Sequence, residues 1–193
     1  AFGVVLTEVD GDGYADIYLA QNFFSPQPET GRLGNGVSLL LQGNGRGGAA
    51  DFNPVWPNRS GLVVSGDAKG LTAADVNNDG WVDFVVGVNQ GELKVFENSG
   101  DSGNRMLNIR LAGPPGNLTG VGAQVTLHLD DGTHQTAQVD AGSSYLSQSS
   151  STLFFGLGGT HSPREIKVHW PDGRITRMTP SSDARQITIK HPK

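Results

Sequence analysis

An internal repeat constrains this chain more than any other feature. Residues 3–22 read GVVLTEVDGDGYADIYLAQN, and they align with GLTAADVNNDGWVDFVVGVN at residues 70–89, an offset of 67. Gly13 then matches Gly80, and Asp16 matches Asp83. Self-similarity at a fixed spacing indicates a repeated structural unit. The first half of the chain therefore contains two copies of one unit.

The repeat continues at a second offset. GVSLLLQGNG at residues 36–45 aligns with GELKVFENSG at residues 91–100, an offset of 55, so the first copy carries 12 extra residues. We place this surplus in a Pro- and Gly-bearing surface loop at residues 23–35. Each copy then reads as strand, acidic loop, strand, connection, strand and Gly-rich turn. Units of this kind form the blades of β-propellers.

The composition predicts an all-β protein. The 193 residues include 28 Gly and 10 Pro, and the apolar runs are short and rich in β-branched residues. After Gly103 the acidic loops stop, so we place a domain boundary near residue 104. The prediction is a region of two propeller-type blades at residues 1–104, followed by a β-sandwich-like domain at residues 105–193.

The second domain shows about eight strand candidates by alternation and turn signals. Asp-Gly pairs at residues 131–132 and 172–173 separate alternating runs, and Asp-Gly favours tight hairpin turns. Short antiparallel strands at this density favour a β-sandwich. The predicted strands cover residues 106–112, 122–129, 134–140, 144–148, 153–157, 165–170, 174–178 and 186–190.

The acidic loop of the second copy, DVNNDGWVD, has the donors of a calcium site. Oxygen-bearing side chains occupy its positions 1, 3, 5 and 9, Gly80 permits a sharp bend, and position 7 can add its backbone carbonyl. Position 12 is Val86 and the flanks resemble strands, which excludes the helical EF-hand. The candidate ligands are Asp75, Asn77, Asp79, the carbonyl of Trp81, and Asp83.

The first copy, EVDGDGYAD, repeats the pattern with one change. Glu8 replaces the first Asp, and its extra methylene can shift that ligand. Polar turns without metal have similar compositions, but crowded carboxylates disfavour one another's ionised forms unless a cation neutralises them. We therefore predict two Ca²⁺ sites, with the 75–83 loop the stronger. The candidate ligands in this copy are Glu8, Asp10, Asp12, the carbonyl of Tyr14, and Asp16.

Both halves resemble known families. The acidic loops and their strands are similar to FG-GAP or VCBS repeats, which implies propeller blades with calcium-binding loops. GVGAQVTLHLDDG at residues 120–132, AGSSYLSQSS at 141–150, LFFGLGG at 153–159 and IKVHWPDGR at 166–174 resemble the ASPIC/UnbV domain. The combination is similar to cartilage acidic protein and its bacterial relatives. This implies a secreted calcium-binding protein and brings no settled activity.

The sequence shows few signals for nucleic-acid binding, for a membrane helix or for catalysis. The net charge is -5 without a basic run, which argues against nucleic acid as a partner. No apolar run approaches the ~20 residues of a membrane helix, there is no cysteine, and no nucleophile elbow is recognisable. The five histidines form no helical metal pair, and strand positions are favoured for them. They are His128, His134, His161, His169 and His191.

Three tryptophans leave two interpretations open. Trp56, Trp81 and Trp170 stand beside turns. Exposed rings could stack on sugars, but large aromatics at such places more often close the edge of a β core. We favour packing for all three.

These features predict a non-catalytic, calcium-binding interaction or adhesion module that is secreted, at the cell surface or periplasmic, with a protein or glycan partner. An alternative is the non-catalytic C-terminal portion of a secreted polysaccharide-degrading enzyme. A third is that the second domain only caps the strand edges of the blades. Two blades leave edges open, so we expect either additional N-terminal blades or self-association.

Overall fold

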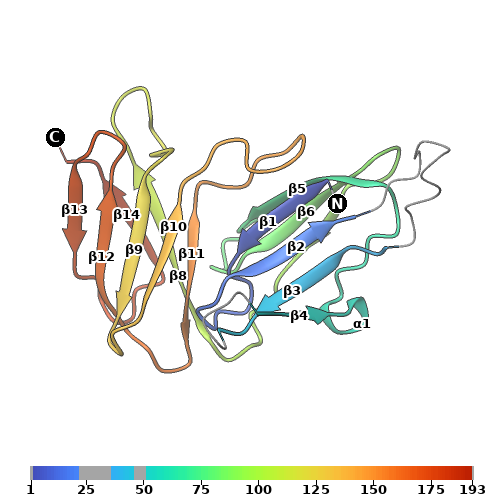
Figure 1. Cartoon of the computed structure of the whole chain (residues 1–193), viewed down its shortest axis with the longest axis horizontal. Coiled ribbons are helices and arrows are strands. Elements are labelled where there is room, and N and C mark those ends of the chain that lie inside the picture. The colour runs from blue at the N-terminus through green and yellow to red at the C-terminus, as the bar shows by residue number, and fades with distance from the viewer. Residues whose placement is uncertain (1, 22–35, 46–50, 193) are drawn as a thin grey trace.

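A computed structural model describes residues 2–21, 36–45 and 51–192. In this part of the chain the regular structure consists of strands in four open sheets and one four-residue helix. The two sheets of the repeats and the two sheets of the C-terminal half form separate regions (Figure 1). The all-β prediction is confirmed. The loop assigned to residues 23–35 lies outside the described residues.

The first repeat forms a four-stranded antiparallel sheet with the order β1-β2-β3-β4. The first acidic loop connects β1 to β2, as the repeat predicted. The short helix α1 (Pro57–Ser60) follows β4 and ends at Gly61, whose φ of 72° suits a glycine. The strands are β1 (Gly3–Thr7), β2 (Asp16–Ala20), β3 (Leu39–Gly43) and β4 (Phe52–Val55).

The second repeat forms a three-stranded antiparallel sheet with the order β5-β6-β7. Its strands correspond in sequence to β1, β2 and β3, and the second acidic loop connects β5 to β6. The chain then continues into the C-terminal half, where β8 begins at Arg105. The strands are β5 (Ala68–Ala74), β6 (Asp83–Val88) and β7 (Lys94–Phe96).

The two repeat sheets share one hydrophobic core. Val5, Tyr18 and Leu40 on the first sheet are buried in the same cluster as Leu71 and Phe84 on the second. The rings of Tyr18 and Phe84 lie 4.7 Å apart. The alternation of buried and exposed residues along β1 and β2 arises because successive side chains of a strand point to opposite faces. One face of the first sheet therefore packs on the second repeat.

The C-terminal half contains two further sheets, with the orders β10-β9-β12-β13 and β11-β8-β14. The Asp-Gly turns form the predicted hairpins β9–β10 and β12–β13, with φ values of 88° at Gly132 and 85° at Gly173. The strands are β8 (Arg105–Ala112), β9 (Gln124–Leu129), β10 (His134–Gln138), β11 (Leu153–Gly158), β12 (Pro163–His169), β13 (Ile175–Met178) and β14 (Gln186–Lys190).

Residues from both C-terminal sheets bury one shared cluster. Leu107 and Phe155 on one sheet, with Leu127 and Val168 on the other, are almost completely buried together with Trp170. No strand pairing joins the two sheets within the described residues. They are open sheets with a common core.

Two expectations for this half are wrong. Residues 144–148 form no strand and make only an isolated bridge between Ser144 and Ser147. Their alternating pattern reflects hydrogen bonds to another strand, as described below. Strand β14 pairs with β8 in parallel, whereas only antiparallel pairs were expected. Alternation cannot show strand direction, because the side-chain period of two is the same in either orientation.

Residues 144–150 cover the outer edge of β5 (Figure 1). The Ser147 hydroxyl accepts a bond from the Leu71 amide at 3.0 Å and donates to the Leu71 carbonyl at 3.0 Å. The Ser149 hydroxyl accepts from the Ala73 amide at 3.1 Å, and the Ser150 amide donates to the Ala73 carbonyl at 2.9 Å. These bonds satisfy backbone groups that an edge strand otherwise leaves open. Such a contact is what the third alternative, a second domain that caps strand edges of the blades, requires.

Among the described residues, we find no helix with the length and apolar character that crossing a membrane requires.

Candidate metal centre

In both acidic loops the position-1 carboxylate accepts two backbone bonds; position 6 donates in each, but the second donor is position 4 in the first loop and position 5 in the second. At position 1, Glu8 accepts bonds from the Gly11 and Gly13 amides, both at 2.9 Å. Asp75 accepts from the Asp79 and Gly80 amides, both at 3.1 Å. The position-1 carboxylate therefore organises the bend of each loop.

The position-9 carboxylates tie each loop to the strands beside it. Asp16 accepts a bond from the Val9 amide at 2.8 Å and from the Gly43 amide at 3.0 Å. Asp83 accepts from the equivalent amides, those of Val76 and Asn98, both at 2.8 Å. Both aspartates have no exposed surface. The repeat is thus conserved between the two copies at the level of individual bonds.

The remaining predicted positions also correspond. At position 5, Asp12 accepts from the Tyr14 amide and Asp79 from the Trp81 amide, each at 2.8 Å. At position 3, Asp10 and Asn77 accept from the amides of these same position-5 residues, at 3.2 and 3.0 Å.

The glycine at position 6 has a positive φ in both copies, 97° at Gly13 and 95° at Gly80. Such values favour glycine because a side chain would be strained there.

The aromatic side chain at position 7 packs against a glycine that follows the third strand of its own repeat. Tyr14 packs against Gly45, and Trp81 packs against Gly100. A Cβ added to Gly45 would lie 2.0 Å from the Tyr14 ring, and one added to Gly100 would lie 2.4 Å from the Trp81 ring. Trp81 also lies close to Gly11, so it contacts the first loop from the second. The two loops are neighbours in space.

The first loop presents the closer group of metal-binding oxygens. One carboxylate oxygen from each of Glu8, Asp10 and Asp16 can be chosen so that all three lie within 4.8 Å of one another. Asp75, Asp79 and Asp83 form no such group, although all three are described. Oxygen donors from carboxylates are those that Ca²⁺ prefers. The first loop therefore groups three carboxylates, whereas the second has the amide oxygen of Asn77 at position 3, where the first has Asp10.

Electrostatics in the first loop also favour a cation. Burial, followed by repulsion from Asp16, Asp12 and Asp10, raises the pKa of Glu8 to about 9. Burial raises the pKa of Asp16 to about 7, although the Val9 and Gly43 amides act to lower it. Burial also raises the pKa of Asp12. A bound cation would favour the ionised carboxylates that burial and mutual repulsion disfavour.

Comparison with known families agrees with this arrangement. Residues 8–86, which include both acidic loops, match the FG-GAP-like repeat family. Residues 113–193 match the ASPIC and UnbV family. The chain is therefore an FG-GAP-like repeat followed by an ASPIC/UnbV domain. No curated protein matched the chain, and the narrower resemblance to cartilage acidic protein relatives stays a prediction.

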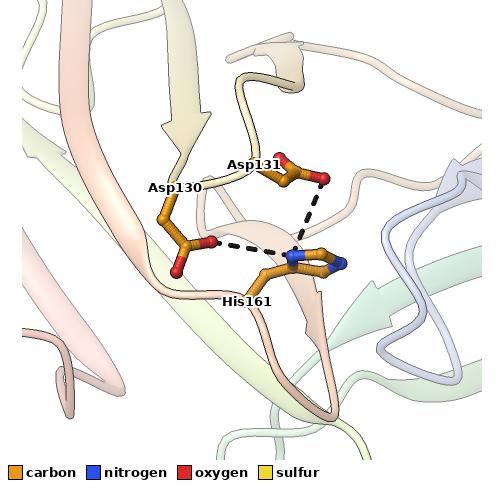
Figure 2. Close-up of side chains that lie close together, drawn as sticks. All are labelled: Asp130, Asp131 and His161. Carbon is orange, nitrogen blue, oxygen red and sulfur yellow. Dashed lines mark ion pairs between the residues drawn. The ribbon is translucent and has the colours of Figure 1, made fainter.

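The ASPIC/UnbV domain contains a second group that could hold a metal. Nδ1 of His161 lies 3.6 Å from an oxygen of Asp130 and 3.6 Å from an oxygen of Asp131 (Figure 2). The two aspartates occupy the β9–β10 turn, and His161 lies between β11 and β12. All three side chains are at least one-third exposed. These contacts are those of ion pairs when His161 is protonated.

Sequence reasoning missed this second group. Asp131 was interpreted as part of a hairpin turn, and for His161 a strand position was favoured over a role as ligand. Nothing in their spacing connects them, because two strands, β10 and β11, lie between them in the chain. They meet because β9 and β12 are antiparallel neighbours, which brings the end of β9 beside the start of β12.

The FG-GAP-like repeat and the ASPIC/UnbV domain enclose a groove of about 810 Å³ between β1 on one side and β10 and β11 on the other. Leu6, 66% exposed, lies on the β1 side, and Glu8 of the first loop also borders the groove. Serine, threonine and glutamine side chains line the ASPIC/UnbV side. The groove combines apolar and hydrogen-bonding surface.

The tryptophans divide between the two interpretations. Trp170 is fully buried in the ASPIC/UnbV core, and Trp81 packs on Gly100. Trp56, at the start of α1, is 63% exposed. The packing interpretation is therefore correct for Trp170 and Trp81 and wrong for Trp56.

Proposed function

We propose that this chain is a non-catalytic, calcium-stabilised interaction module that acts outside the cytoplasm. The observation that carries the proposal is the match between the two acidic loops in the bonds of their position-5 and position-9 carboxylates, together with the grouped oxygens of Glu8, Asp10 and Asp16. The five predicted positions of each loop would together hold one Ca²⁺, so that the two loops would bind two ions. When bound, the ions would supply the positive charge that crowded carboxylates need.

We further propose that the repeats are two blades of a propeller. One row of paired residues across the first sheet consists of Leu6, Ile17 and Leu41. Their equivalents in the second repeat are Ala73, Phe84 and Phe96, which belong to the core between the repeats or pack against it. The corresponding face of the first repeat has the same apolar character, so another blade could cover it.

The interaction surface that we propose is the groove between the two domains. Its size matches that of sites for small ligands, and its hydroxyl and amide side chains suit a glycan or a protein segment. The exposed ring of Trp56 offers a second place for stacking on a sugar.

Thermal unfolding in calcium and in chelator tests the calcium proposal. At a calcium concentration 100 times the dissociation constant, one site stabilises the fold by about 2.7 kcal/mol. In a chain of this size, this stabilisation raises the melting temperature by roughly 5–10 °C. Equal melting temperatures in calcium and in chelator would disprove the proposal.

The non-catalytic part of the proposal needs its own experiment. The calcium-loaded chain would be applied to a polysaccharide depolymerisation screen and to glycan and protein arrays. We expect binding without turnover. Turnover that is lost on substitution of an aspartate or histidine, while calcium binding persists, would contradict a non-catalytic role.

A further inference from the structure

The two acidic loops differ in what surrounds them. Their internal bonds are similar, yet Glu8 is 4% exposed and Asp12 is half-buried, whereas Asp75 is half-buried and Asp79 is exposed. We therefore look for the difference in the groups that pack against each loop. The first loop is covered more completely than the second.

The cover of the first loop comes from the ASPIC/UnbV domain and the residue before β8. The Gly158 amide, at the end of β11, donates to the Gly11 carbonyl at 2.8 Å. The Asn104 side chain donates to the Asp10 carbonyl at 3.0 Å. Gln135 on β10 donates to the Gly156 carbonyl at 2.6 Å, holding this part of β11 in place. A register shift between Gly156 and Gly158 brings the strand end towards the loop.

Gly156 forms a wall of the first site. A Cβ built on Gly156 would lie 2.5 Å from Oε2 of Glu8 and 2.5 Å from the Gly13 amide nitrogen. Both atoms belong to the bend that positions the Glu8 carboxylate. Only a residue without a side chain permits this approach of β11. The β11 backbone thus packs directly on a proposed metal ligand.

We propose that the first cation site is a joint site of both domains, in which the ASPIC/UnbV domain positions Glu8 and the cation strengthens docking between the domains. This inference rests on the proposed calcium binding. Docking excludes water beside the carboxylates, which strengthens their attraction to a cation. By linkage, a cation that binds the docked form more tightly must stabilise docking by the same factor. The second loop is more exposed and receives one bond from β8, from the Asn108 side chain to the Gly80 carbonyl at 3.0 Å, so we expect its coupling to the C-terminal half to be weaker.

A substitution at Gly156 tests whether the close approach of β11 to Glu8 contributes to the calcium affinity of the first loop. Calcium titrations would use the full chain carrying Asp75→Asn, which isolates the first loop, with and without Gly156→Ala. We expect the affinity to fall about 10- to 100-fold, the range for groups that orient metal ligands. Gly159→Ala is the matched control, because its Cβ would lie 3.9 Å from the nearest atom. We expect this control to retain its affinity within about twofold.

A second variant covers the case in which Gly156→Ala disturbs folding, which circular dichroism would reveal. Asn104→Ala removes one contact with the loop and introduces no clash, so we expect a several-fold loss of affinity. Hydrogen exchange of the Gly158 amide gives a readout of docking itself. We expect calcium to slow this exchange, and Glu8→Gln to abolish the effect.

The possible failures are distinguishable. If the Asp75→Asn chain takes up no calcium, the proposed calcium binding of the first loop is wrong. If it binds calcium, but neither Gly156→Ala nor Asn104→Ala changes the affinity and calcium leaves Gly158 exchange unchanged, the joint site is wrong. Equal losses in Gly156→Ala and in Gly159→Ala would also overturn it.

Discussion

At the scale of single residues, Glu8 departs most from what the repeat alone implies. The sequence suggested that its extra methylene weakens the first loop. In the structure, both Glu8 oxygens accept amide bonds and one lies against β11. The longer side chain therefore reaches the junction with the ASPIC/UnbV domain, and it belongs to a group of three carboxylates with Asp10 and Asp16.

Glu8 predicts an unusual pH dependence without calcium. Its pKa rises from 4.5 in the unfolded chain to about 9 in the folded one. A carboxyl with a raised pKa stabilises the fold at low pH, and this stability is lost as the pH rises through the folded pKa. In chelator, we expect the melting temperature to fall by several degrees between about pH 5.5 and pH 9.

The matched variant for this experiment is Glu8→Gln, which keeps the shape and cannot ionise. It should leave only the smaller decline due to Asp16, complete near pH 7. Saturating calcium should remove the decline in the unchanged chain, because the metal binds the ionised carboxylates. A melting temperature in chelator that rises across this range would contradict the raised pKa of Glu8.

At the scale of elements, the Ser-rich segment at residues 144–150 replaces a neighbouring strand. Its hydroxyls bond to the Leu71 and Ala73 backbone as a strand would, but through side chains. This accounts for the wrong strand prediction there. A polar alternating segment resembles an edge strand in sequence, and only its partner shows that its side chains make the bonds.

We expect Ser147→Ala to destabilise the fold by about 1–2 kcal/mol. The change removes two hydrogen bonds to Leu71 and leaves half-buried backbone groups without them. Chemical denaturation measures the loss, and hydrogen exchange of the Leu71 amide should quicken. Ser151→Ala is the control, since no bond of its hydroxyl is seen in the described structure. Equal stability of the two variants would show that the segment does not cap β5.

At the scale of the whole molecule, the two faces of the first repeat's sheet differ in how far their side chains are exposed. Leu40 is 5% exposed in the core between the repeats, whereas Leu6 on the opposite face is 66% exposed. Their side chains belong to the same sheet and have the same volume. The difference between the exposed fractions of Leu40 and Leu6 therefore shows how much surface the second repeat covers by packing on the first.

In this chain, Leu40→Ala should cost about 2–5 kcal/mol, the range for a buried leucine. Leu6→Ala should cost no more than about 0.5 kcal/mol, as expected for an exposed site. Urea denaturation of both variants measures the difference. A large loss for Leu6→Ala would mean that this face is already covered in solution, for example by a second copy, and a sedimentation experiment on the same sample would reveal that copy.

Much of this protein follows from its sequence alone, because local patterns have local causes. The 67-residue offset predicted two equivalent units, and Asp-Gly predicted both C-terminal hairpins, since each depends on residues close together in the chain. The ten candidate ligands come from the spacing within single loops, and they stay a prediction.

Tertiary structure decided how those local pieces combine. It made β14 parallel to β8, placed Ser147 against Leu71, brought His161 to Asp130 and Asp131, and buried one acidic loop more deeply than the other. Each of these contacts joins residues that lie far apart in the chain. The ligand spacing that the two loops share carries no information about which of them a distant glycine, Gly156, will approach.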